Sequence, residues 1–274
     1  MPAFALAAAL LATQTPAPTP TDTAPAGYRL VWSDEFSTDG LPDPALWTPN
    51  TSRNREGWYN NELQYYAAGR LQNSRIENGH LVIEARSETV DAATFLDTGG
   101  QHFTSARLDS VGPGWTYGRF EARIRLPCAR GSWPAFWMLP VNGGQWPLSG
   151  EIDILEHVGH QPGVVHGTVH TGAYNHVAHT EKGGPLTVPD ACEAFHRYQV
   201  EWTPQAVVFS VDDAPYYRFD NDGRGEAASW PFDTPFHLIL NVAVGGDWGG
   251  AEGVDEAAFP QRMEVDYVRV WQAD

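Results

Sequence analysis

Apolar and polar residues alternate along much of the chain, as they do in strands that bury one face. In residues 118–127 (GRFEARIRLP), Phe120, Ala122 and Ile124 share one side and charged residues occupy the other. Similar alternation predicts strands over residues 80–86, 197–202, 206–213 and 263–272. No stretch of a dozen residues follows the 3.6-residue period of a helix. The pattern therefore predicts an all-β protein.

One continuous apolar run and many turn residues complete this pattern. Residues 236–244 (FHLILNVAV) are apolar almost throughout, which is typical of a strand buried on both sides. Asn78-Gly79 favours a tight turn, and 27 Gly and 21 Pro suit a chain of many short strands. Because no repeat or second pattern interrupts them, residues 28–274 are expected to form one domain, a sandwich of two antiparallel sheets.

The N-terminal residues differ from the rest. Residues 4–12 form an apolar stretch that matches the hydrophobic part of a secretion signal and is too short to cross a bilayer. No Lys or Arg precedes it, which departs from the usual signal. A Thr/Pro/Ala-rich linker then leads to about residue 27. Residues 1–27 therefore predict a secreted or periplasmic protein.

Composition limits the partners. The net charge is −17, from 34 acidic and 17 basic residues, and such a surface repels phosphate backbones and anionic lipids. Neither nucleic acid nor a membrane is an expected partner, and a neutral ligand fits best. The eleven Trp residues suit either core packing or stacking on sugar rings. Cys128 and Cys192 suit one disulfide or two independent thiols, because sequence does not show whether their Cβ atoms meet.

Three acids lie close together in residues 149–159 (SGEIDILEHVG). On a regular strand Glu151 and Asp153 share a face, while Glu156 points to the other. One extra residue, inserted as a β-bulge, reverses the phase and brings Glu156 onto the same face. An edge strand with acids facing solvent is the alternative. Clustered carboxylates repel one another, and this cost favours a functional site.

Paired carboxyl groups also match a known chemistry. A retaining glycosidase uses one as nucleophile and the other as acid and base. Repulsion between such groups raises the pKa of one of them, as a general acid requires.

The acidic segment resembles the E-x-D-x-x-E signature of family 16 glycoside hydrolases, in the bulged form of the laminarinase-like (endo-1,3-β-glucanase) branch. Other segments resemble laminarinase sequences in the same order: LVWSDEF (30–36), NNELQYY (60–66), NGHLVIEAR (78–86), SARLDS (105–110), YGRFEARIRLP (117–127), SWPAFWMLP (132–140), LILNVAVGGDWGG (238–250) and VDYVRVWQ (265–272). The resemblance extends from about Tyr28 to the end of the chain.

The resemblance implies a concanavalin-like β-jelly-roll sandwich with a substrate cleft across its concave sheet. It implies a secreted, monomeric endo-β-1,3-glucanase that retains anomeric configuration, acts on neutral β-glucan and needs no cofactor for catalysis. By position in the motif, Glu151 resembles the nucleophile, Glu156 the acid/base and Asp153 the assisting carboxylate.

The resemblance also marks positions that line the cleft in the family: Asn61, Arg107, Trp133, Trp137, Trp146 and His170. Core packing and substrate contact explain Trp137 equally well, and a surface strand position is the alternative for Arg107. His170 is expected to bond sugar or the acid/base residue. His166 and His170 have a spacing that suggests zinc on a helix, but the surrounding residues alternate as a strand, so zinc is disfavoured.

A structural calcium ion is common on the convex side of family members. The matching positions are Glu35 and Gly79, through their carbonyl groups, and Asp266, through its carboxylate. Oxygen donors of this kind suit calcium.

Two kinds of alternative function remain. The same fold and chemistry suit mixed-linkage glucan or a galactan, because the loop at residues 171–180 departs from the usual laminarinase sequence. A non-catalytic glucan-binding module is the second alternative, although such proteins typically lose the glutamates.

Overall fold

A computed structural model describes residues 24–274. The apolar stretch at residues 4–12, which predicts a secretion signal, lies outside these described residues. Within residues 24–274, no helix has the length and apolar character to span a lipid bilayer.

The strands form two sheets. The larger sheet contains β1 (Tyr28–Asp34), β3 (Gln64–Tyr66), β4 (Ser74–Glu77), β5 (His80–Ser87), β6 (Phe103–Ser105), β8 (Gly118–Arg125), β13 (His196–Trp202), β14 (Ala206–Val211), β15 (Ala214–Asp220) and β17 (Gln261–Ala273). The smaller sheet contains β2 (Trp47–Pro49), β7 (Arg107–Ser110), β9 (Ser132–Pro140), β10 (Glu151–His157), β11 (Val164–His170), β12 (Lys182–Thr187) and β16 (Phe236–Val244). The helical elements described are short 3₁₀ turns: η1 (Tyr59–Asn61), η2 (His176–Ala178) and η3 (Glu256–Ala258).

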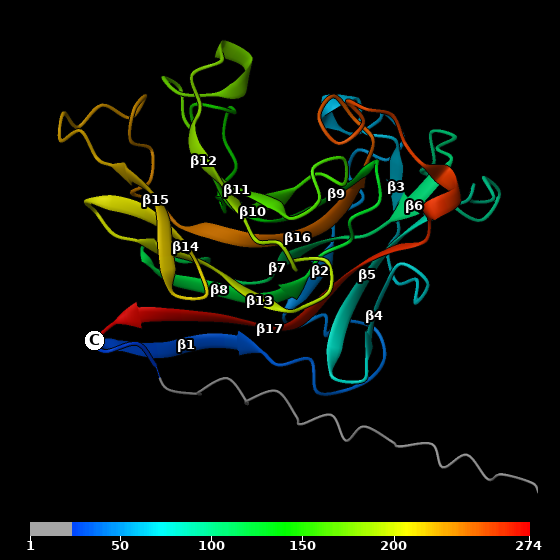
Figure 1. Ribbon diagram of the computed structural model, residues 1–274, viewed down its shortest axis with the longest axis horizontal. Coiled ribbons are helices and arrows are strands. Elements are labelled where there is room, and N and C mark those ends of the chain that lie inside the picture. Colours follow the sequence, from blue (N-terminus) through cyan, green and yellow to red (C-terminus); the bar gives the residue numbers. More distant parts are fainter. Residues whose placement is uncertain (1–23) are drawn as a thin grey trace, which may run out of the picture.

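The two sheets lie in separate layers, with β9, β10 and β16 above β8, β13 and β17 in Figure 1. The smaller sheet has the order β12-β11-β10-β9-β16-β7-β2, and the main path of the larger is β15-β14-β13-β8-β17-β5-β6-β3. Neighbouring strands pair antiparallel except β3 and β6, which pair parallel. The prediction of an all-β jelly-roll sandwich is confirmed, and this parallel pair is the departure from it.

The core fills the space between the layers. Phe120 and Ile124 of the larger sheet and Phe136, Leu238 and Leu240 of the smaller one have no exposed surface. Burying a side chain of this size contributes about 1.5–3 kcal/mol relative to leaving it exposed. The alternation predicted for residues 118–127 is therefore the inward face of β8, although the strand itself ends at Arg125.

Turn chemistry explains the hairpin of β4 and β5. Asn78 and Gly79 both adopt positive φ angles, 55° and 78°, as the two central residues of a tight hairpin turn must. Glu77 pairs with His80 across this turn, as the dipeptide predicts.

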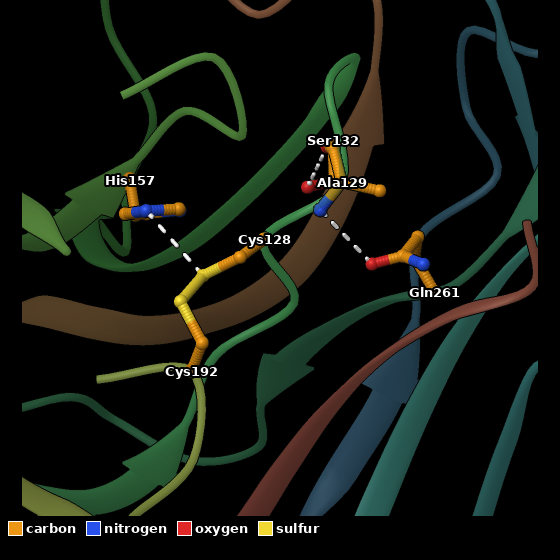
Figure 2. Close-up of a disulfide and its surroundings, with 6 residues drawn as sticks. All are labelled: Cys128, Ala129, Ser132, His157, Cys192 and Gln261. Atoms are coloured by element: carbon orange, nitrogen blue, oxygen red, sulfur yellow. Dashed lines mark hydrogen bonds between the residues drawn. A yellow bond between two sulfur atoms is a disulfide. The ribbon is translucent and has the colours of Figure 1, made fainter. Parts of the chain in front are cut away.

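Cys128 and Cys192 form a disulfide, with Cα atoms 5.9 Å apart and a sequence separation of 64. Figure 2 shows that His157, at the end of β10, points toward this bond, and its Nε2 lies 3.7 Å from Sγ of Cys128. The sequence left disulfide and free thiols open, and the structure selects the disulfide. The loop that it closes contains β9, β10, β11 and β12.

Candidate active site

Strand β10 carries the three clustered acids and contains the predicted bulge. Its pairing with β9 passes from Asp153–Trp137 directly to Leu155–Phe136, so one residue of β10 has no counterpart. Ile154 and Leu155 consequently both point into the core, with 2% and 0% of their surfaces exposed. The extra residue reverses the alternation, and the prediction of a bulge is confirmed.

Glu151, Asp153 and Glu156 thus lie on the face of the smaller sheet that is turned away from the core, which we name the active face. Each of the two glutamates accepts a hydrogen bond from an indole N–H group. Trp146 Nε1 donates to Glu151 Oε2 over 3.1 Å, and Trp133 Nε1 donates to Glu156 Oε1 over the same distance. Two of the predicted tryptophans therefore orient the two glutamates.

Asp153 lies between the glutamates and is only 2% exposed. His170, on β11, places its Nε2 atom 3.3 Å from Asp153 Oδ2 and 3.8 Å from Glu151 Oε1. The imidazole therefore contacts the Glu151 side of the cluster rather than Glu156, the acid/base candidate that the sequence suggested as one of its partners. Among the described residues, the only group of His, Cys, Asp or Glu side chains close enough to share a metal ion is Glu151, Asp153 and His170, with ligand atoms within 4.8 Å of one another.

Burial and mutual repulsion raise the pKa values of the acids. Burial is the main cause for all three carboxyl groups, and the charge of Asp153 adds to it for both glutamates. The pKa of Glu156 rises to about 8, although His170 and the Trp133 hydrogen bond oppose the shift. At neutral pH at least one carboxyl group of the cluster therefore stays protonated, and a general acid needs such a proton.

Trp137 lies on the active face as the cross-strand neighbour of Asp153. Of the two positions that the sequence left open for it, it therefore has the one outside the core. Its Nε1 donates to Asn241 Oδ1 over 2.7 Å, and the Arg107 guanidinium lies 4.9 Å from its ring centre. Arg107 is held in turn by Asp109, whose Oδ1 accepts from Nε over 2.8 Å. The predicted residues Trp137 and Arg107 form one fixed unit beside the acids.

Asn61 lies in η1, outside the sheet. Its Nδ2 donates to Asp247 Oδ1 over 2.8 Å, and Asp247 N donates to the Asn60 carbonyl over 2.7 Å. These bonds join η1 to the loop that follows β16. In Figure 1 the two segments rise together beside the smaller sheet.

Three further side chains lie near the acids: Trp248 and Glu62 were not predicted as site residues, whereas His176 belongs to the loop at residues 171–180 that was expected to shape the substrate subsites. Trp248 lies 5.5 Å from Trp133 between ring centres, and His176 lies 4.9 Å from Trp146. Glu62 is near enough to Glu156 for its charge to raise the pKa of that group. Trp248 and Glu62 belong to the segments GGDWGG and NNELQYY, which marked the resemblance, but loop packing decides how close they come to the acids.

The three residues predicted to bind calcium lie near a junction of strands. β1 and β5 pair end to end with the same edge of β17, up to Val268 and Val265 respectively, so Glu35 and Gly79 approach Asp266 from two sides. Oδ2 of Asp266 accepts from Arg123 Nη1 over 2.6 Å, and Oδ1 lies 3.6 Å from Nε2 of His80. Carboxylate and carbonyl oxygens suit calcium in kind, but an ion on Oδ1 would have to displace this histidine.

Comparison with known proteins agrees with this geometry. The model of "Glycosyl hydrolases family 16" matches residues 61–269. A β-glucanase of Rhodothermus marinus is 52% identical over 254 residues, 89% of this chain and 85% of the relative. A glucan endo-1,3-β-glucosidase of Cryptopygus antarcticus is 38% identical, covering 89% of this chain and 92% of the relative.

Solved structures give the same result. The crystal structure of SCLam, a non-specific endo-β-1,3(4)-glucanase, superposes with a TM-score of 0.88 at 54% identity, covering 92% of this chain and 94% of that one. Because sequence, fold and clustered acids all match, the chain belongs to glycosyl hydrolase family 16.

Proposed function

We propose that this protein is an endo-β-1,3-glucanase that hydrolyses β-glucan with retention of anomeric configuration. The observation that carries the proposal is the bulged strand β10, which presents Glu151 and Glu156 on one face, each with its own indole donor. The names of the similar proteins, β-glucanase and endo-1,3-β-glucosidase, support the substrate class.

The reaction proceeds in two displacements. Glu151 attacks the anomeric carbon while Glu156 gives its proton to the glycosidic oxygen, so that the bond to the leaving sugar breaks as the bond to Glu151 forms. Glu156, now ionised, takes a proton from water, and the resulting hydroxide equivalent displaces Glu151 from the same carbon. No redox partner or catalytic ion takes part in either step.

The neighbours of the acids divide these roles. Trp146 and His170 both lie on the Glu151 side and stabilise negative charge there, as a nucleophile requires. Asp153 raises the pKa of both glutamates, and Glu62 adds repulsion at Glu156, which helps to keep the proton on the acid. Trp133 holds the acid in orientation.

Substitution of the two glutamates tests the proposal. Glu156→Gln should lower laminarin hydrolysis about 10²–10⁴-fold, the usual contribution of general acid–base catalysis, and Glu151→Gln should abolish it. Glu56→Gln is the matched control, because the Glu56 side chain is 68% exposed and pairs with Arg53 rather than with a residue of the active face. Normal release of reducing ends by either active-face variant would refute the mechanism.

Mixed-linkage glucan is the second candidate substrate. SCLam, at 54% identity, is described as non-specific for 1,3(4) linkages, and the loop at residues 171–180 places His176 against Trp146. Product analysis on laminarin, lichenan and agarose distinguishes the two glucans and also tests a galactan.

We further infer that the protein is exported and holds calcium. The disulfide suits an oxidising compartment, and polysaccharides are cut outside the cell. Asp266 Oδ1 and the carbonyls of Glu35 and Gly79 would hold the ion, whose role is to join the ends of β1 and β5. Chelation followed by the melting temperature tests this inference.

A further inference from the structure

Glu62 is a fourth carboxylate near the catalytic acids. It follows η1 directly and forms an isolated bridge with Gly245, at the end of β16. The side chain is half-buried, and burial is the main cause that raises its pKa to about 7. At slightly acidic pH it therefore carries a proton part of the time, and it can both donate to and accept from a hydroxyl group.

The orientation of Glu62 is fixed from the protein side. The fully buried Gln64 accepts a hydrogen bond from Val244 N at its Oε1, over 2.8 Å. Its amide NH₂ group must then face the other way, where Nε2 donates to Glu62 Oε2 over 2.8 Å. One carboxylate oxygen is thus anchored by an amide that cannot turn.

Close packing places Glu62 near the indole ring that donates to the acid/base residue. A Cβ atom on Gly246 would lie 3.2 Å from Cγ of Glu62 and 3.4 Å from Cζ3 of Trp133. Only the glycine therefore separates Glu62 from the indole that donates to Glu156. The electrostatic effect of Glu62 on the pKa of Glu156 agrees with this short separation.

An open cavity of about 530 Å³ adjoins the same residue. Its lining includes Glu62 and Leu63 and continues with polar side chains of β5 and the following loop, Ser87, Glu88 and His102. This volume exceeds that of a single sugar ring. The surface beyond Glu62 is therefore open, and it offers both polar and apolar side chains.

In the proposed reaction Glu156 protonates the oxygen of the departing sugar, so the leaving part of the substrate lies on the Glu156 side. We propose that Glu62 is a substrate-binding residue for this leaving part, accepting a hydrogen bond from one of its ring hydroxyls. This inference rests on the proposed function, which it extends by assigning the acceptor side of the site. Hydroxyl recognition by carboxylates is favourable because the bond is charge-assisted.

The test compares two substrates that differ only in the leaving group. Laminaripentaose leaves a sugar on the Glu156 side, whereas phenyl β-laminaribioside leaves phenol, which still needs an acid but has no ring hydroxyls. Glu62→Ala should lower kcat/KM for laminaripentaose about tenfold or more, the usual effect of losing a charge-assisted hydrogen bond. The phenyl substrate should change by less than about twofold on the same grounds. Glu62→Gln should lie between, because its carbonyl still accepts.

Each other outcome has its own meaning. Equal losses on both substrates would show that Glu62 supports the fold or tunes Glu156, and would overturn the proposal, as would unchanged cleavage of laminaripentaose. Glu56→Gln controls for loss of a surface charge, and melting temperatures check folding; Glu62→Gln carries the test if the alanine variant is unstable. A wild-type protein that cleaves neither substrate would instead refute the proposed function itself.

Discussion

Glu151 and Glu156 have different proposed roles, nucleophile and acid, because their neighbours differ. Glu151 has Trp146 and His170 beside it, and both favour its ionised form. Glu156 has Trp133 and also feels the charge of Glu62, while burial and the charge of Asp153 favour the neutral form of both glutamates. The difference between nucleophile and acid is thus a property of the surroundings, as it is in other paired carboxylates.

Replacing Trp146 by Phe tests the nucleophile side. The hydrogen bond from Trp146 lowers the pKa of Glu151, so its loss should raise that pKa and move the acidic limb of the kcat/KM profile to higher pH. The bond to a charged group is worth about 1.5–3 kcal/mol, which corresponds to roughly a tenfold to hundredfold loss of kcat/KM. An unchanged acidic limb would contradict the assignment of Glu151 as the group that must ionise.

The raised pKa of Glu156 predicts that activity and stability both fall as the pH becomes alkaline. Catalysis needs protonated Glu156, so kcat/KM should fall as the pH rises through about 8. The raised pKa also means that the folded state binds more protons than the unfolded state between about pH 4.5 and 8. Stability should therefore decline over this range as pH rises.

Thermal melts of the wild type and of Glu156→Gln measure this effect. The variant has no carboxyl group to titrate at this position, so its melting temperature should fall less steeply from pH 5 to pH 8. Parallel curves for the two proteins would show that Glu156 titrates near its ordinary pKa.

Site residues could be predicted from the sequence where a short motif contains them. The acids, Trp133 and Trp146 lie where the sequence placed them, because one strand and its immediate neighbours position them. Glu62 and Trp248 were missed because they reach the acids through loops, and loop packing leaves no periodic signal in sequence.

At the level of elements, β10 shows how one inserted residue changes the face on which the following side chains lie. Its two consecutive core residues, Ile154 and Leu155, are the visible sign of the bulge. Hydrophobic pattern alone predicted this feature, because the acids and the apolar residues change phase at the same place.

Deletion of Ile154 tests the role of the bulge. With one residue fewer, Glu151, Asp153 and the former Glu156 would alternate regularly and still share the active face, so a measurable part of the activity should survive. The loss of a buried side chain should cost about 2–5 kcal/mol of unfolding free energy. Ile154→Ala is the control, since it removes the same packing but keeps the bulge. A folded deletion variant without activity, beside an active Ile154→Ala, would contradict this account.

Other elements were harder to predict. β16 has the predicted bounds, residues 236–244, because a fully buried strand gives a continuous apolar run. β15 was not predicted, since it is the edge strand of the larger sheet and its residues are mostly exposed or half-buried. The parallel pair of β3 and β6 depends on contacts between distant segments, which alternation does not encode.

For the whole molecule, the disulfide is the single covalent tie between distant segments of the described chain. Loop-closure entropy for 64 residues corresponds to about 4 kcal/mol. The double variant Cys128→Ser and Cys192→Ser should therefore lose about 2–5 kcal/mol of unfolding free energy, measured by denaturant titration. Activity at 25 °C should persist, because strand pairing, not the sulfur bridge, orients the acids. An unchanged denaturation midpoint would contradict this prediction.

The bridge has a topological consequence as well. Between Cys128 and Cys192 the polypeptide is a closed ring, and this ring carries Glu151 and Glu156, the proposed catalytic residues, and the tryptophans that donate hydrogen bonds to them. A protease that cuts once in the exposed segment 141–145 opens the ring but releases nothing, because both new ends remain attached through sulfur. Nicked molecules would then migrate as one species until a reductant separates them, and the catalytic strands would stay in register after the damage.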